Sequence, residues 1–262
     1  MTMDLSEQLA LSDQNLVATT REWARRIPGS VVLEEQGVLL CRTAEQASSA
    51  VLRTGVQAAP PAEMTLARAA AFFPEGGRAY TIISREHADR DLERAAEAAG
   101  FTVLVDEPGM VLDHPVAAPQ LPGGVELRRA TDAQRRADFL AVVAEVFSDW
   151  ATTAEAVFGG TRGLLSVPHA AGFVAYVGGE AVSAAVAQVS GCVGGVDFVA
   201  TRAPYRGRGL GEVVTRAASN AGFSLGARMM ALNSDPRAEG LYGRIGYVTI
   251  SQYRRWGYPP DG

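Results

Sequence analysis

The chain has 262 residues, of which 47% are hydrophobic and 20% charged, enough for one large domain or two small ones with a substantial core. Its formal net charge of −5 argues against a nucleic-acid-binding protein that works through bulk positive charge. No apolar run approaches the roughly 18 residues of a membrane-spanning helix, and the acidic, polar N-terminus lacks the pattern of a signal peptide. We therefore expect a cytoplasmic protein whose partners include neither nucleic acid nor a membrane.

Two features of the composition narrow the chemistry. All 24 basic residues are arginine, so neither a Schiff-base lysine nor a Walker-type phosphate-binding lysine is available. Cys41 and Cys192 occur in no metal-binding spacing, and neither do the histidines, so no metal is expected. We expect both cysteines to be free thiols in a reducing compartment, with a disulfide between them as the alternative.

A proline- and glycine-rich segment divides the chain. Residues 114–124, HPVAAPQLPGG, hold three prolines and two glycines, which is typical of a linker. We therefore predict two α/β units, one at residues 1–113 and the other at residues 125–262.

The second unit begins with a strand, a helical region and a meander. Residues 125–129 are predicted to be a strand, and Thr131 or Asp132 caps a helix whose apolar residues recur with helical periodicity. A second, less regular helix is predicted at about 152–165. Residues 172–201 form three short β-rich runs, which predict an antiparallel meander. The pairs that separate these runs are Gly178-Gly179, Ser190-Gly191 and Gly194-Gly195.

A glycine-rich bend follows the meander. The segment 205-YRGRGLGE-212 contains three glycines and two arginines, and the residues after it have the apolar periodicity of an amphipathic helix. A strand at 228–232 comes next, then a short helix capped by Asp235 and ended by Gly246, and a last strand at 247–256. The bend therefore joins a buried strand to the N-terminus of a helix.

The end of the first unit resembles the end of the second. Residues 80–106 and 229–252 each read as a strand, a serine, a helix with acidic residues and arginine, a glycine–aromatic pair and another strand. This order indicates an internal repeat, although any strand–helix–strand segment would look similar.

Three kinds of phosphate-binding turn could account for the bend. A Walker loop requires a lysine, and a dinucleotide-binding turn requires G-x-G-x-x-G after the first strand of a βαβ unit, whereas these glycines are spaced G-x-G-x-G after a meander. The segment 206-RGRGLG-211 instead matches R/Q-x-x-G-x-G/A between a strand and a helix. Together with Asn233 and 241-LYGRIGY-247, it makes residues from about 125 to 256 resemble the GNAT N-acetyltransferase superfamily.

The resemblance implies a binding site for acetyl-CoA at the bend. A helix N-terminus offers unpaired N–H groups and a partial positive charge to the diphosphate, and glycines let the backbone approach it. The preceding strand would pair with the pantetheine arm, and the amide of Val199 would face the thioester carbonyl. The alternative for Arg208 is that it is only an exposed surface charge, and the alternative for Asn233 is that it is only a turn residue before a helix. The donor-binding residues that the resemblance implies are Val199, Ala200, Thr201, Arg206, Gly207, Arg208, Gly209, Leu210, Gly211, Glu212 and Asn233.

The resemblance also implies direct attack of a neutral amine on the thioester. Tyr242 matches the tyrosine that protonates the leaving thiolate in the family, although its helical spacing would equally suit a core residue. Asp197 is the candidate base, because its separation of two residues from Val199 would place both side chains on one face of a strand. The alternatives to Asp197 as the base are a chain of waters and a residue of the first unit. The alternative roles for the Asp197 carboxylate are structural and substrate-binding.

We therefore predict an acetyl-CoA-dependent N-acetyltransferase, a monomer or homodimer, that acts on a primary amine of a small molecule or peptide. The expected fold is α/β of the α+β type, with a mixed, mostly antiparallel GNAT sheet flanked by helices. The first unit has no R-x-x-G-x-G segment and has Ala96 where Tyr242 would stand, so it is expected to be a degenerate GNAT-like or scaffold unit of a tandem protein. The alternatives are a non-catalytic acyl-CoA-binding sensor and a Rossmann-type oxidoreductase.

Overall fold

The computed structural model describes residues 3–44, 49–55, 59–73 and 80–258, and the chain divides into two compact units. The N-terminal unit comprises Leu5–Gly109, Asn233–Arg237 and Thr249–Gly262. The C-terminal unit comprises Met1–Asp4, Met110–Leu232 and Ala238–Val248. This division differs from the predicted boundaries at residues 113 and 125, because the last strand of each predicted half has residues in both units.

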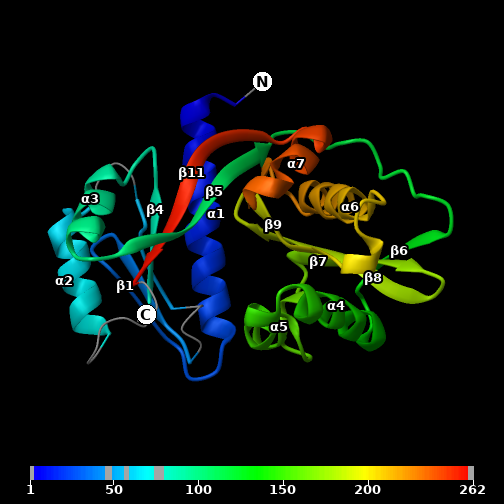
Figure 1. The fold of residues 1–262 in the computed structure, drawn as a ribbon, viewed down its shortest axis with the longest axis horizontal. Coiled ribbons are helices and arrows are strands. Elements are labelled where there is room, and N and C mark those ends of the chain that lie inside the picture. The colour runs from blue at the N-terminus through cyan, green and yellow to red at the C-terminus, as the bar shows by residue number, and fades with distance from the viewer. Residues whose placement is uncertain (1–2, 45–48, 56–58, 74–79, 259–262) are drawn as a thin grey trace. The chain divides into compact units, whose positions relative to one another are not determined.

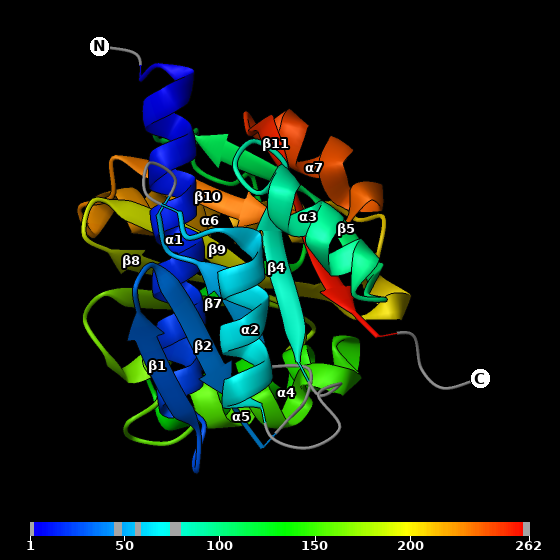
Figure 2. The same ribbon diagram turned by 90° about the vertical axis from the view of Figure 1, so that its left-hand side faces the viewer.

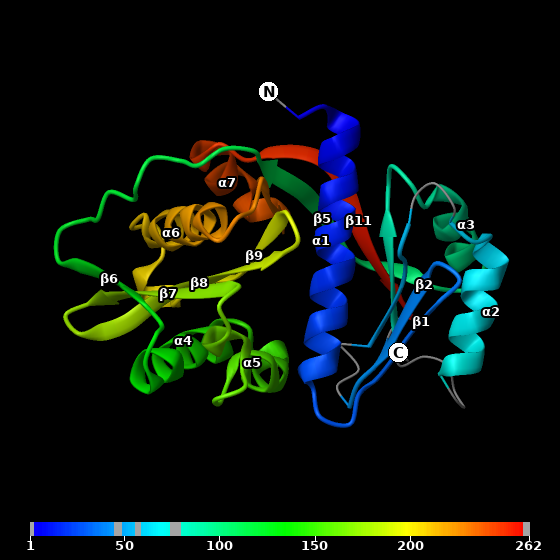
Figure 3. The same ribbon diagram turned by 180° about the vertical axis from the view of Figure 1, so that it is seen from behind.

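The C-terminal unit is an open, mixed sheet with helices on both faces. Its elements are β6 (Val125–Arg129), α4 (Ala133–Val146), α5 (Ala151–Phe158), β7 (Ala170–Val177), β8 (Glu180–Ser190), β9 (Val193–Thr201), α6 (Leu210–Ser224), β10 (Met229–Asn233) and α7 (Glu239–Ile245). Strands β6 to β9 are antiparallel neighbours, and β10 runs parallel to β9. Figures 1 and 3 show α6 and α7 on one face of β7–β9 and α4 and α5 on the other.

Local sequence explains where the first elements of this unit begin and end. Strand β6 coincides with the predicted strand, and α4 begins after Asp132, whose side chain accepts a hydrogen bond from the amide of Arg135 at 2.9 Å. Helix α5 is shorter than the predicted 152–165. It ends before Gly159, and only a single 3₁₀ turn, Leu164–Ser166, follows in that range.

The meander is confirmed, but one of its predicted turns is wrong. The glycines at 178–179 and Gly191 have left-handed backbones in turns, whereas Gly194 and Gly195 lie inside β9. A Cβ on Gly194 would lie 2.6 Å from the sulfur of Met230, and one on Gly222 of α6 would lie 2.3 Å from the same atom. Gly194 and Gly222 therefore make room for Met230 between β9 and α6. In the sequence, a glycine that serves such packing looks the same as one that signals a turn.

The N-terminal unit is also a sheet with helices on both faces. Its elements are α1 (Leu5–Arg26), β1 (Val31–Glu35), β2 (Val38–Arg42), β3 (Ala50–Arg53), α2 (Ala62–Phe72), β4 (Thr81–Arg85), α3 (Arg90–Ala98), β5 (Thr102–Leu112) and β11 (Val248–Gly257). The strand order is β1-β2-β3-β4-β11-β5, and Figure 2 shows α2 and α3 in front of these strands with α1 behind them. None of the helices in the described parts of the chain is long and apolar enough to cross a membrane.

The two units share one order of connections. In each, three antiparallel strands lead through a helix (α6 or α2) to a strand that is parallel to the third, and a second helix (α7 or α3) follows. The strand that follows α3 along the chain is β5, and the strand that follows α7 is β11, which pairs antiparallel with β4. This shared order supports the internal repeat that the sequence indicated.

Candidate active site at the glycine-rich turn

The turn between β9 and α6 leaves a helix N-terminus open. Gly207 and Gly209 have left-handed backbones, with φ of 75° and 78°, and Gly209 is the N-cap of α6. A Cβ at either position would meet nothing within 4 Å. The left-handed conformation, and not crowding, therefore favours glycine here. Because glycine has no side chain to cap the helix, the first N–H groups of α6 are available to an anion.

Gly211 and Leu210 fix the helix behind this turn. A Cβ on Gly211 would lie 3.2 Å from Cδ1 of Leu241 in α7 and 3.7 Å from Oγ1 of Thr201, so this glycine allows close packing. Leu210 is only 1% exposed and belongs to the hydrophobic core. Both residues were predicted as donor-binding, and their side-chain positions serve the packing of α6.

The two arginines of the motif are exposed and held at the turn. Arg206 donates from Nε to the carbonyl of Thr201 at 3.1 Å, and the guanidinium of Arg208 lies 5.2 Å from the ring centre of Tyr205. The Tyr205 hydroxyl in turn donates to Glu180 at 2.7 Å. Positive charge is therefore concentrated beside an open helix N-terminus. Glu212 is paired with Arg216 at 2.8 Å, which reduces its repulsion of an anion.

Strand β9 changes its register before it reaches the turn. Asp197 pairs with Val186 and Ala200 with Ala184, so two residues, Phe198 and Val199, stand opposite Ala185. This β-bulge gives Phe198 a φ of 50°, which is unusual for a bulky residue.

The bulge corrects the predicted position of Asp197. Directly paired residues share a face of the sheet, and Val186 and Ala184 share one, so Asp197 lies on the same face as Ala200. Val199 packs against the core cluster on the α6 side of the sheet, with Ala185. The expectation that Asp197 and Val199 share a face is therefore wrong, because the extra residue breaks the alternation.

Backbone carbonyls at the end of β9 already have protein partners. Ser183 donates to the carbonyl of Ala200 at 2.6 Å, and Arg206 donates to that of Thr201. The Ser183 hydroxyl also lies 2.8 Å from Oγ1 of Thr201. The pairing of β9 with β10 covers Val193–Gly195 and Met229–Ala231, and β9 then continues to Thr201.

A file of phenyl rings leads from the core of the C-terminal unit to the bulge. The ring centres of Phe139 and Phe158 are 5.8 Å apart, those of Phe158 and Phe198 are 5.3 Å apart, and those of Phe198 and Phe147 are 5.5 Å apart. Phe139 and Phe158 are fully buried, whereas Phe147 and Phe198 are partly exposed. Sequence reasoning missed Phe198, because nothing in the residues around it signals a left-handed backbone.

Tyr242 and Tyr247 form a pair of tyrosines on the face of the sheet that α6 covers. Tyr242 is 8% exposed, and its ring centre is 6.1 Å from that of Tyr247. The Tyr247 hydroxyl is within 2.8 Å of Ser219 Oγ. Burial raises the pKa of Tyr247, and the charge of Asp197 adds to that rise. The sequence did not predict that Tyr247 would lie beside the proposed proton donor, Tyr242. The place of Tyr247 after a glycine indicated only the start of a strand.

Asn233 and the cysteines complete the predicted positions. Asn233 is the exposed last residue of β10 and belongs to the segment 233–237 that groups with the N-terminal unit. Cys41 and Cys192 are free, as predicted, and burial raises the pKa of Cys41 to about 12. Within the described residues no group of three His, Cys, Asp or Glu side chains could hold a metal ion.

The order of elements and the glycine turn before α6 define a GNAT-type transferase fold. Residues 131–247 match the model of the acetyltransferase (GNAT) family. This part of the chain therefore resembles a GNAT acetyltransferase domain in both sequence and fold, and the predicted resemblance and fold class are confirmed.

Solved structures with the same fold extend over nearly the whole chain. A GCN5-related N-acetyltransferase from Kribbella flavida is 19% identical, with a TM-score of 0.72 over 95% of this chain and 96% of its own. One from Sphaerobacter thermophilus is 18% identical, with a TM-score of 0.59 over 94% and 91%. A tandem GNAT protein from the clavulanic acid biosynthesis pathway is 12% identical, with a TM-score of 0.56 over 96% and 94%. No curated protein matches the sequence.

Proposed function

We propose that the chain is an acetyl-CoA-dependent N-acetyltransferase whose donor site is the turn between β9 and α6. The observation that carries the proposal is the pair of left-handed glycines, Gly207 and Gly209, before the open N-terminus of α6. Arg206 and Arg208 beside them supply the charge that suits a diphosphate. A nicotinamide cofactor fits less well, because the turn follows an antiparallel meander and not the first strand of a βαβ unit.

The pantetheine arm would follow the part of β9 beyond its pairing with β10. The carbonyls of Ala200 and Thr201 already accept hydrogen bonds from side chains, which favours Val199 at the bulge as the backbone partner of the thioester. An N–H group of Val199 that faces the thioester carbonyl would stabilise the oxyanion formed by attack of the amine. Asn233 would contact the arm from the end of β10.

Two side chains are proposed to move protons in the reaction. The amine nitrogen attacks the thioester carbon, the C–S bond breaks, and Tyr242 donates a proton to the leaving sulfur; the proton that the nitrogen loses as the amide forms then restores the Tyr242 hydroxyl. An amine with a pKa near 10 must first lose a proton, and Asp197 would accept it through water. Water is included because Asp197 lies on the opposite face of the sheet from Val199.

Tyr242→Phe tests this function directly. We expect kcat for acetyl transfer to fall by at least about tenfold, with little change in the Kd of acetyl-CoA, because only the proton donor is lost. Release of the CoA thiol with a panel of primary amines measures the rate. Tyr247→Phe is the matched control, since it removes a hydroxyl bonded to Ser219 and should lower stability without the same fall in kcat. Binding of acetyl-CoA without turnover on any amine would support the non-catalytic sensor.

The phenyl file suggests that the acceptor amine carries an apolar body. Phe198 lies next to Val199, so its partly exposed ring would be close to the transferred acetyl group. Phe198→Gly removes the ring and keeps the bulge, because glycine adopts a φ of 50° without strain.

For this variant we expect kcat/KM for 2-phenylethylamine to fall about tenfold relative to that for ethanolamine, on the scale of an aromatic contact. Competition between the two amines measures the ratio. Phe139→Leu, deeper in the file, should lower stability and leave the ratio unchanged. An equal loss for both amines with Phe198→Gly would mean that the ring serves packing alone.

The remaining proposals concern the setting of the reaction. We expect the protein to act in the cytoplasm, as a monomer or homodimer, on an amine of a small molecule or peptide. The N-terminal unit would be a degenerate, scaffolding copy of the transferase fold.

A further inference from the structure

The N-terminal unit contains the same divergence of parallel strands that would admit the donor in the C-terminal unit. Strands β3 and β4 pair only at Ala50–Val51 and Thr81–Ile82, and they continue to Arg53 and Arg85. In the C-terminal unit, β9 continues past its pairing with β10 in the same way. The ends of β3 and β4 therefore correspond, by topology, to the place of the pantetheine arm.

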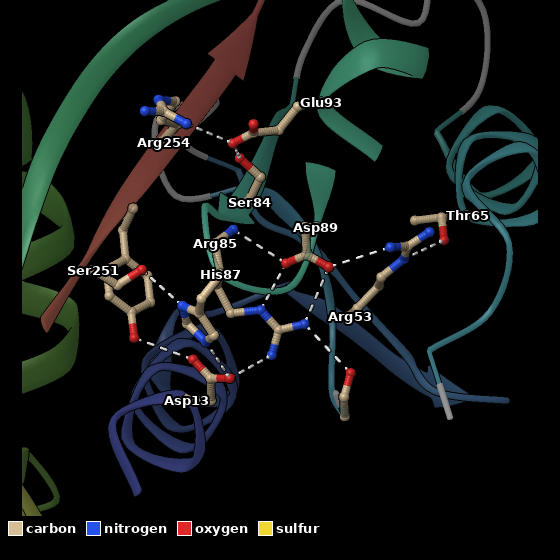
Figure 4. Close-up of polar contacts among 12 residues, drawn as sticks. Asp13, Arg53, Thr65, Ser84, Arg85, His87, Asp89, Glu93, Ser251 and Arg254 are labelled. Atoms are coloured by element: carbon tan, nitrogen blue, oxygen red, sulfur yellow. Dashed lines mark hydrogen bonds and ion pairs between the residues drawn. The ribbon is translucent and has the colours of Figure 1, made fainter. Parts of the chain in front are cut away.

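A network of buried charges connects the ends of these two strands. Arg85, at the end of β4, donates to the carbonyl of Gly55 beyond β3 at 3.3 Å and to both oxygens of Asp89 at 2.6 and 3.2 Å. Arg53, at the end of β3, donates to Asp89 at 3.3 Å. Both arginines are 2% exposed and Asp89 is fully buried. Figure 4 shows Asp89 between the two guanidinium groups.

The network also extends to both layers of helices. On the α1 side, Asp13 accepts a hydrogen bond from Arg85 at 3.0 Å. On the other side, Arg53 donates to Thr65 of α2 at 3.4 Å and holds Asp91 of α3 through two bonds of 2.7 and 2.8 Å. Guanidinium and carboxylate groups therefore fill the space between the strand ends from one helix layer to the other.

The helix that corresponds to α6 also lacks an anion site. Helix α2 begins after Pro61, and its first turn carries the acidic residue Glu63. Proline offers no N–H group, and the Glu63 carboxylate repels a phosphate, whereas the first-turn carboxylate of α6, Glu212, is paired with Arg216. The residues before it, 59-APP-61, contain no glycine that could take the place of Gly207 or Gly209.

We propose that the N-terminal unit is a second copy of the transferase fold whose donor cleft is filled by its own arginine–aspartate network, so that each chain binds a single acyl-CoA. The stoichiometry of one acyl-CoA per chain rests on the proposed function of the C-terminal unit. The closure of the N-terminal cleft rests on the network alone.

Two measurements on the full chain test the proposal. Calorimetric titration with acetyl-CoA should give one site per chain, and Gly209→Glu should reduce the count to zero. Hydrogen–deuterium exchange without ligand should show segments 50–55 and 81–91 exchanging at least tenfold more slowly than segment 196–212, because the first two close on each other and the last is open. Added acetyl-CoA should slow exchange at 196–212 and leave the other two segments unchanged.

The outcomes separate the two proposals. A site that survives Gly209→Glu, or an effect of acetyl-CoA on segments 50–55 or 81–91 in that variant, would overturn the closed cleft. Fast exchange of those segments in the ligand-free chain would overturn it as well. If acetyl-CoA does not bind to the unmodified chain at all, the proposed function fails, and the exchange rates without ligand still decide whether the N-terminal cleft is closed.

Discussion

Gly209→Glu is expected to weaken acetyl-CoA binding at least about a hundredfold, or by about 2.7 kcal/mol. Gly209 has a φ of 78°, a conformation that costs a residue with a Cβ about 1–2 kcal/mol. The new side chain would also place a carboxylate at the N-terminus of α6, where it competes with the diphosphate for the same N–H groups. Calorimetric titration measures the loss.

Two further variants separate charge from backbone strain. Gly226→Glu adds the same side chain at a φ of 104° near the other end of α6, where a Cβ also meets nothing within 4 Å. This control should lose stability and keep its affinity. Gly209→Asn tolerates the left-handed backbone and carries no charge, so it should retain most of the binding. Equal loss of affinity in Gly209→Glu and Gly226→Glu would place the donor elsewhere.

The elements of the C-terminal unit were predictable because their signals are local. Strand β6 coincides with the predicted range, α4 begins at the predicted Asp132 cap, and α7 ends at Gly246, whose φ is 121°. Each of these ends depends on a residue whose preference acts within one turn of chain. The glycine turn before α6 is equally local, so its motif could be found without a structure.

The features that escaped prediction depend on residues far apart in the chain. Gly194 faces Met230 of the next parallel strand, which no local pattern reveals. The bulge at Phe198 depends on the pairing of β9 with β8, and it moves Asp197 away from the face of Val199. The buried network joins Asp13 of α1 and the arginines that end β3 and β4 to the N-cap of α3, and the sequence shows these only as scattered charges.

Asp89→Asn is expected to destabilise the protein by about 3–5 kcal/mol, the usual cost of removing one partner from a buried ion pair. Asp89 is the shared acceptor of Arg53 and Arg85, at 3.3 and 2.6 Å, and none of its surface is exposed. Without its charge, two guanidinium groups that are almost fully buried would face each other with less compensation. Urea unfolding of the full chain at neutral pH measures the change.

Asp91→Asn is the matched control for this effect. Asp91 also binds Arg53, at 2.7 Å, but its side chain is 47% exposed, so solvent screens the pair and the loss should stay below about 1 kcal/mol. The hydrogen bonds from Arg53 lower the pKa of Asp91 from 3.8 to about 2. A lowered pKa stabilises the fold above the ordinary value, so the contribution of Asp91 should persist at neutral pH and disappear as the pH falls from about 4 to 2.

The comparison of the two variants decides what the network does for the fold. A large loss for Asp89→Asn and a small loss for Asp91→Asn would mean that the buried centre of the network holds β3 and β4 in place. Equal small losses would mean that water reaches both carboxylates, because only solvated charges can be removed at so little cost. The cleft between the strand ends would then be open, against the closed structure inferred for the N-terminal unit.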